Sequence, residues 1–311
     1  MKKVRLLKDT DTPAGREKAL QAIETAIQNN GWVKLIEEDS STADYQVDVK
    51  AIDAENSNIY KLDEGEIIYE ICDRSVEPII LRPAIKINEP KAATTIVKRL
   101  VHLTKYQAAE ELDNHSLNSE LKGKIEIEVL GTMDDFEDGD PIEPEPLADS
   151  ENITVNVGEV LFLKIRNKYH SNLNFTVLDL ESNWAISQIE PYGAVSQFTP
   201  LDAGEDKLIA LRIALPEGEE KGSDIYKVFA TKDAANFRWL TLPSLDTPLP
   251  NTKEKGIPKT RAGLNYLEKM LAYFAEDNPD LKKNPFRSGN PIAFPSNNWT
   301  TTEIKIQVEN L

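Results

Sequence analysis

Between residue 122 and about residue 250, short segments of alternating apolar and polar residues recur at regular intervals, and this spacing constrains the fold most. Successive side chains of a strand point to opposite faces, so each segment is typical of a half-buried strand. Gly, Asn, Pro and Asp between the segments are typical of the turns of an all-β sandwich. The segments are KIEIEVLG, ITVNVG, EVLFLKIRN, LNFTVLDL, WAISQIEP, SQFTPL, KLIALRIAL and DIYKVFATK. We therefore predict an antiparallel immunoglobulin-like β-sandwich.

Two of these segments are apolar on both faces. They are EVLFLKIRN at 159–167 and KLIALRIAL at 207–215. A strand that is buried on both faces is typical of the centre of a sheet. We therefore predict a central position for 207–215 as well as for 159–167.

Roughly the first 115 residues predict a small α+β domain. An apolar stripe at helical spacing predicts a helix that begins at Pro13, with Thr12 as its cap, and ends before Asn30 and Gly31. A long helix is predicted at about 90–112 from the same period. The predicted strands between the two helices are WVKLIE, YQVDVKAI, NIYKL, EIIYEIC and PIILRPAIKI, and KKVRLL precedes the first helix.

The apolar period changes from 3.6 to 2 near 115–122, and this change predicts the domain boundary. The overall prediction is an α+β protein with an α+β domain at 1–118 and a β-sandwich domain at 119–311. The sandwich domain carries an added helix at about 261–276 and a C-terminal strand, TTTEIKIQVEN.

Two irregular segments interrupt the strands of the second domain. The acidic loop at 133–151 contains nine acidic residues and no basic ones, and the basic linker at 248–261 is rich in Pro and Lys. Pro250, Pro258 and Gly256 disfavour regular structure around the linker. We expect both segments to be irregular and mobile.

Charge and composition exclude several classes of partner. The formal net charge is −17, which repels nucleic-acid phosphates and anionic lipid, so we expect no nucleic-acid and no membrane partner. No apolar run approaches the roughly 20 residues of a membrane span, and the first residues lack the apolar core of a secretory signal. Cys72 is the only cysteine, which excludes an internal disulfide. A cytoplasmic location fits these facts.

Motifs for catalysis and for cofactors are missing. The sequence contains no nucleophile elbow, no P-loop and no dinucleotide-binding glycine motif, so no catalytic residue and no cofactor is assigned. A hydrolase that pairs Cys72 with one of the three histidines stays open as an alternative. A calcium- or ligand-binding β-sandwich is a further alternative. The acidic loop offers Asp134, Asp138, Asp140 and Glu145 as weak candidate ligands, with Gly139 at the turn position of an EF-hand loop and Phe136 in place of a ligand.

The stretch FATKDAANFRWLTLPSLD, at 229–246, places a basic residue between two aromatic ones. In a strand, Phe237 and Trp239 would point to the same face and Arg238 to the other. We predict that the two aromatic side chains enter the sandwich core. Arg238 would then face solvent, where a guanidinium can bind a carboxylate or an aromatic ring of a partner.

Several separated phrases resemble the C-terminal region of caspase-family peptidases, the orthocaspases or metacaspase-like proteins of cyanobacteria and other bacteria. The phrases are RLVHLTKYQAAEELDN, LDLESNWAISQIEPYGA, IALPEGEEKGSDIYKVFAT and NFRWLTLPSLD, and the likeness covers roughly residues 65–311. The catalytic signatures of that family are a His-Gly pair and a downstream Cys. This chain has neither, since its one cysteine stands in YEICDRS.

The resemblance implies a non-catalytic regulatory or protein-recognition module of a caspase-like peptidase system. Its expected partner is a caspase-like peptidase domain, in cis or in trans. Such peptidases of the bacterial kind are expected to cut after Arg or Lys, so Lys259 and Arg261 in the basic linker are candidate cleavage sites.

Overall fold

A computed structural model of the chain describes most of the 311 residues. The described residues are 1–8, 13–28, 30–37, 42–114, 116, 119–137, 139–147, 149, 152–193, 196–216, 218–247, 266–276 and 298–310. They form two compact units, the first within Met1–Gln107 and the second from Ala108 onward. In the part of the chain that is described, no helix is both long and apolar enough to cross a membrane.

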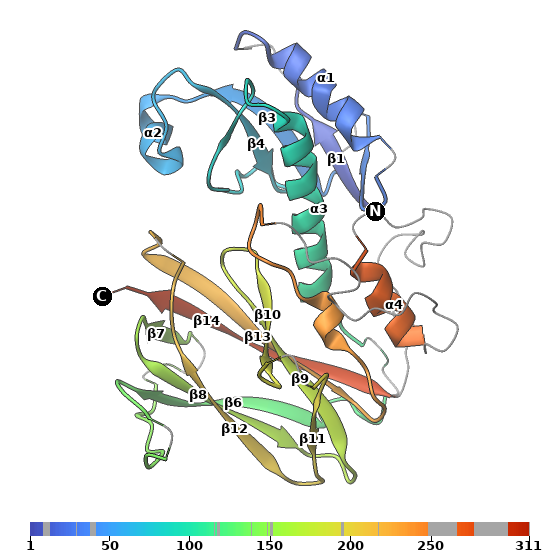
Figure 1. The fold of residues 1–311 in the computed structure, drawn as a ribbon, viewed down its shortest axis with the longest axis vertical. Coiled ribbons are helices and arrows are strands. Elements are labelled where there is room, and N and C mark those ends of the chain that lie inside the picture. The colour runs from blue at the N-terminus through green and yellow to red at the C-terminus, as the bar shows by residue number, and fades with distance from the viewer. Residues whose placement is uncertain are drawn as a thin grey trace. The chain divides into compact units, whose positions relative to one another are not determined.

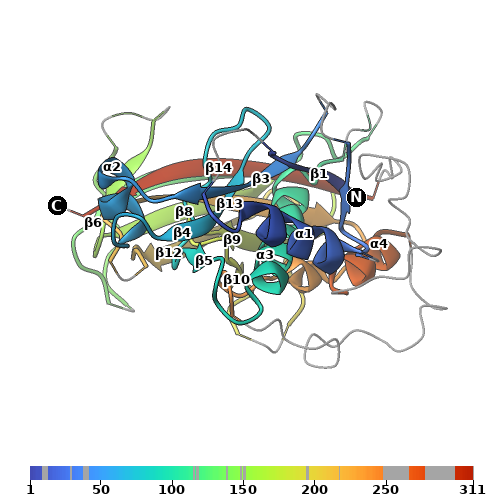
Figure 2. The same ribbon diagram turned by 90° about the horizontal axis from the view of Figure 1, so that it is seen from above.

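The first unit is built on a five-stranded mixed sheet (Figures 1 and 2). Its strands, in the order β2-β1-β3-β4-β5, are Val33–Leu35, Lys2–Leu6, Tyr45–Ala51, Ile67–Cys72 and Ile85–Lys86. β1 pairs in parallel with β2 and β3, whereas β4 pairs antiparallel with β3 and β5. Its helices are α1, Arg16–Ile27, α2, Ala54–Tyr60, and α3, Ala92–Glu110.

Helices α1 and α3 cover the same face of this sheet. Tyr69 of β4 donates a hydrogen bond from its hydroxyl to the Ala19 carbonyl of α1 at 3.0 Å. Ile71 lies two residues along the same strand, so it shares that face, and it lines a pocket together with Ile96 of α3. The apolar stripes of both helices therefore explain the burial of this face of β4.

Two local predictions for the first unit are wrong. NIYKL is the end of helix α2 and not a strand, because Asp53 caps this helix by accepting a hydrogen bond from the Asn56 backbone at 2.8 Å. The first helix begins at Arg16 rather than at Pro13. Gly15 stands at its cap with φ 89°, a left-handed conformation that glycine adopts readily.

The second unit is the predicted sandwich. One sheet has the order β12-β8-β6, with the strands Asp206–Arg212, Val160–Asn167 and Ile125–Met133. The other has the order β10-β9-β13-β14-β7, with the strands Ile186–Glu190, Leu173–Leu180, Lys221–Thr231, Trp299–Glu309 and Thr154–Asn156. The short strand β11, Thr199–Leu201, pairs with β9.

This topology is that of an immunoglobulin-like sandwich. β6, β8 and β12 take the places of strands A, B and E, and β10, β9, β13 and β14 take those of C′, C, F and G. The pairing is antiparallel, as predicted, except that β7 runs parallel to β14. The core between the sheets is built from alternate residues of both, including Leu163, Val177, Val228 and Ile306.

The segment 207–215 does not lie at the centre of a sheet. β8 is the central strand and β12 is an edge strand, with Leu208 42% exposed. Alternation alone could not reveal this difference, because the outward-facing Phe162 of β8 is covered by a neighbouring segment whereas Leu208 is not. The prediction of a central strand is therefore correct for 159–167 and wrong for 207–215.

Candidate functional site

Four regions were candidates for function on sequence grounds: the surroundings of Cys72, the acidic loop, the stretch around Arg238, and the basic linker. The candidate cleavage residues Lys259 and Arg261 lie outside the described residues, so their cleavage stays a prediction.

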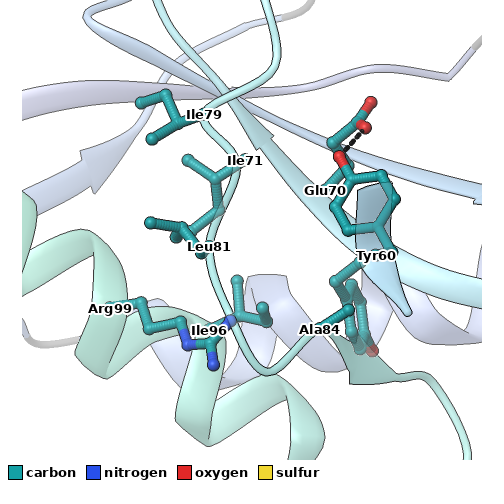
Figure 3. Close-up of a pocket in the computed structure, with 9 residues that line it drawn as sticks. Tyr60, Glu70, Ile71, Ile79, Leu81, Ala84, Ile96 and Arg99 are labelled. Atoms are coloured by element: carbon teal, nitrogen blue, oxygen red, sulfur yellow. Dashed lines mark hydrogen bonds between the residues drawn. The ribbon is translucent and has the colours of Figure 1, made fainter. Parts of the chain in front are cut away.

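A small pocket opens beside β4 in the first unit (Figure 3). Its lining is Tyr60, Tyr69, Glu70, Ile71, Ile79, Leu81, Ala84, Ile96 and Arg99. Figure 3 shows Tyr60 directed toward Glu70 on one side, while Arg99 reaches in from α3 on the other. The cavity has room for about one water molecule, which is too little for a substrate.

Three polar side chains near this pocket, Lys50, Tyr60 and Glu70, contact one another. Glu70 is buried and accepts a hydrogen bond from the Tyr60 hydroxyl at 2.5 Å, and Lys50 Nζ lies 2.6 Å from the same carboxylate oxygen. Burial, followed by the hydrogen bond to Glu70, raises the pKa of Tyr60 above its usual range. Arg99 donates to the Pro83 carbonyl at 2.6 Å. Tyr60, Lys50 and Glu70 therefore form a polar cluster that joins α2, β3 and β4.

Cys72 lies at the end of β4, close to this cluster. Its side chain is 2% exposed, and its sulfur lies 3.9 Å from Glu70 Oε2. Burial, and after it the charge of Glu70, raises the pKa of the thiol to about 12. A cysteine nucleophile reacts as the thiolate, and this environment keeps the thiol protonated at neutral pH. The geometry therefore gives no support to a hydrolase built on Cys72.

The acidic loop folds back along β6 of the second unit. Thr132 and Glu145 exchange two backbone hydrogen bonds, at 3.1 and 2.8 Å. This return requires glycine at position 131, since a Cβ there would lie 2.0 Å from the Glu145 carbonyl oxygen. Phe136 packs edge-on against Phe162 of β8, with ring centroids 5.1 Å apart. The first part of the loop is thus a cover for the outer face of the three-stranded sheet.

The calcium prediction gains nothing from this arrangement. Among the residues that the structure describes, no group of three acidic, His or Cys side chains is close enough to hold a metal ion. Asp138, one of the four candidate ligands, lies outside the described residues. Asp135 instead forms an ion pair with Arg212 of β12 at 3.2 Å. We derive no metal chemistry from this loop.

The aromatic stretch is buried as predicted, but it is not a strand. Residues Phe237–Leu240 form a 3₁₀-helix, η1, in which Trp239 is 3% exposed and Arg238 is half-buried. Phe237 stacks on Phe229 of β13 with ring centroids 4.4 Å apart. Phe229 points away from the core between the sheets, because its neighbours Val228 and Ala230 point into it. The aromatic residues therefore cover the outer face of the larger sheet, where helix α4, Tyr266–Phe274, also contacts η1.

A buried lysine completes this outer layer. Lys227 of β13 is 2% exposed, its Nζ lies 2.7 Å from Glu303 of β14, and it donates to the carbonyl of Glu110 at the end of α3. Asn114 donates to the Trp299 carbonyl at 2.6 Å. These bonds fasten residues 108–114 to the sandwich. Their place in the second unit explains why the compact units divide at 107/108.

Two exposed features were missed by the sequence analysis. Tyr192, in the connection between β10 and β11, is 92% exposed. The outer edge of β12 is the second feature, and Leu208 on this strand is 42% exposed. The phrase EPYG was a usable signal for Tyr192, because Pro and Gly on either side predict a turn that projects its side chain.

Comparison with known proteins does not place this chain. No protein-family model, no curated protein and no solved structure matches it.

Proposed function

We propose that this chain is a non-catalytic, protein-recognition module that regulates a caspase-like peptidase, either as part of the same protein or as a separate partner. The resemblance of its phrases to the C-terminal region of that family is the reason for proposing a caspase-like peptidase as the partner. We place its action in the cytoplasm, because its single buried thiol needs no oxidising compartment.

The observation that carries the recognition role is the exposure of Tyr192. A tyrosine with 92% of its surface in water presents a large, rigid aromatic ring without burying it. Tyrosine is enriched at protein interfaces and at their energetic centres, where its ring fills a pocket and its hydroxyl finds a partner. In immunoglobulin-like domains the recognition residues stand on loops of this kind, at the ends of strands.

The described surroundings of β4 support the same proposal. The pocket beside β4 accommodates about one water molecule, and Cys72 is held protonated by its surroundings. A fold by itself does not determine function, so the argument depends on these particular residues.

The test is a calorimetric titration of the full chain into purified caspase-like peptidase domains encoded in the same genome. We expect binding, and we expect Tyr192→Ala to weaken it at least tenfold, the effect of losing more than about 1.4 kcal/mol at an interface centre. Tyr192→Phe keeps the ring and should keep most of the affinity. Thr247→Ala, a change in another exposed part of the same unit, is the control. If no such domain binds, the proposal fails; if binding is unaffected by Tyr192→Ala, the assignment of the surface fails.

A further inference from the structure

Among the described residues, nothing pairs with the outer edge of β12. Of the described strands, β12 pairs with β8 alone, from Asp206 opposite Arg166 to Arg212 opposite Val160. In a constant-type immunoglobulin sandwich a further strand, D, pairs with strand E on this side. None of the described residues takes that place, and the short strand β11 pairs with β9 in the other sheet.

The hydrogen bonds between β12 and β8 show which backbone groups of β12 point away from β8. Asn167 donates to the Glu205 carbonyl and Ile213 donates to the Glu159 carbonyl, so the odd-numbered residues of this stretch bond to β8. Bonding alternates along an antiparallel strand, which turns the N–H and C=O groups of the even-numbered residues to the outside. These residues are Asp206, Leu208, Ala210 and Arg212, and all four are exposed.

The side chains of this edge are complementary to those of a second copy. In an antiparallel pair of two β12 strands centred on Ile209, Asp206 of each copy stands opposite Arg212 of the other, and Leu208 opposite Ala210. In this register the four residues whose backbone groups point away from β8 stand opposite the same four residues of the other copy. Each of them can therefore donate one backbone hydrogen bond to the other copy and accept one from it. Moving the register by two residues in either direction sets Leu208 opposite Leu208 or Ala210 opposite Ala210, and it removes both pairs of opposite charge.

The ion pairs that Asp206 and Arg212 form within one copy are compatible with the pairing of two β12 strands. Asp206 accepts two hydrogen bonds from Arg166, at 2.6 and 2.8 Å, and Arg212 lies 3.2 Å from Asp135. A carboxylate has about four acceptor positions, so Asp206 retains capacity for the arginine of a second copy. The result would be a continuous row of alternating charges across the two-fold axis.

We infer that β12 is a self-association edge, through which two copies of this chain join their three-stranded sheets into one continuous sheet. The interface is isologous, because the same strand is used by both copies. Edge pairing of this kind gains specificity from the register of alternate side chains, and here Asp206 and Arg212 set the register. This inference concerns the sandwich alone and does not depend on the proposed peptidase partner.

The experiment is sedimentation analysis of the full chain, whose monomer mass is 34.9 kDa, at concentrations up to about 1 mM and near-physiological salt. We expect a concentration-dependent species of twice that mass. Asp206→Lys and Arg212→Glu, each alone, should weaken association at least tenfold by placing like charges opposite one another.

An equal mixture of these two variants should restore association. In the mixed dimer the introduced lysine faces the introduced glutamate at one end of the strand pair, and the unchanged Asp206 and Arg212 face each other at the other end. Both ends then carry opposite charges again. Misfolded variants could not produce this rescue.

Two further variants sharpen the test. Leu208→Pro removes an outward N–H that bonds to nothing within the described chain, and it should abolish association while the monomer stays folded. Lys164 lies on the central strand β8 and forms an ion pair with Glu128 of β6. Lys164→Glu breaks this ion pair and should leave association unchanged. A monomer at every concentration, a dimer that withstands both charge variants, or a mixture without rescue would overturn the inference. Slowed amide exchange at Leu208 and Ala210 only when another protein is added would likewise overturn it, by assigning the edge to a different partner.

Discussion

The sandwich contains two neighbouring carboxylates, the buried Asp224 and the half-buried Asp179, and removing the charge of one of them should stabilise the protein. Asp179 of β9 stands opposite Tyr226 of β13, and Asp224 lies two residues before Tyr226 on the same face. Burial, and after it the charges of Asp224 and Glu181, raises the pKa of Asp179 well above its usual range. One oxygen of Asp179, Oδ1, is buried without a hydrogen-bond partner. Both acids therefore lie where ionisation is costly.

Asp224→Asn is the informative change. Burial raises the pKa of Asp224 from 3.8 to about 6, and its Oδ1 accepts a hydrogen bond from the Ser182 backbone at 3.1 Å. Asparagine retains this acceptor and removes the charge. A pKa difference of about two units corresponds to about 3 kcal/mol. Because the amide keeps part of the desolvation cost, we expect the variant to be about 1–3 kcal/mol more stable than the wild type at pH 7.

The sign of the pH dependence follows from the raised pKa. Below pH 3.8 both the folded and the unfolded states hold the proton, so this group contributes no difference. As the pH rises from 3.8 to about 6, the unfolded state loses the proton first and the wild type loses stability. Above about pH 6 the cost is complete, so the advantage of the variant should be largest there and should vanish near pH 4.

Urea unfolding of wild type and variant between pH 4 and pH 8 measures this difference directly. Ser223→Ala, a change at the neighbouring position on the opposite face of β13, is the control and should show no such pH-dependent gain. A variant that is less stable at pH 7, or a difference that is constant over the whole range, would refute the reasoning.

Three further predictions follow from the packing. Trp239→Ala should destabilise the second unit by about 3–5 kcal/mol, because Trp239 is buried. Arg238→Ala should cost far less, because Arg238 is only half-buried. Equal losses of stability in urea unfolding would contradict this difference. Val76 has φ 68° at an exposed turn, so Val76→Gly should raise stability by about 0.5–1 kcal/mol, and a lower melting temperature would contradict this. Cys72 should resist a thiol probe at pH 7 until the protein is unfolded, and rapid labelling of the native state would reopen its role as a nucleophile.

The strands of the sandwich could be predicted because their information is local. Alternation and turn residues marked every strand of the second unit, and the long helix was visible from its period. Helix α2 was missed because five residues, NIYKL, suit a strand by composition. The decisive signal was the capping side chain of Asp53, which stands outside that stretch.

The candidate site could not be predicted to the same extent, since it depends on neighbours that are distant in sequence. The exposure of β12 depends on which strand lies beside it, and the raised pKa of Asp224 depends on β9 and β13 meeting in one register. The burial of Phe237 was predicted correctly, but it packs on the outer face of a sheet rather than between the sheets. The alternation of apolar and polar residues shows that a side chain is covered, but it does not show which element covers it.

We propose that this chain regulates a caspase-like peptidase without catalysing a reaction itself. The most direct test of this proposal is the rate at which a purified caspase-like domain from the same genome cleaves a substrate after Arg or Lys, with and without an equimolar amount of this chain. We predict a change in that rate that Tyr192→Ala reduces and Tyr192→Phe preserves. An unchanged rate with every such domain, or peptidase activity in this chain alone, would contradict the account.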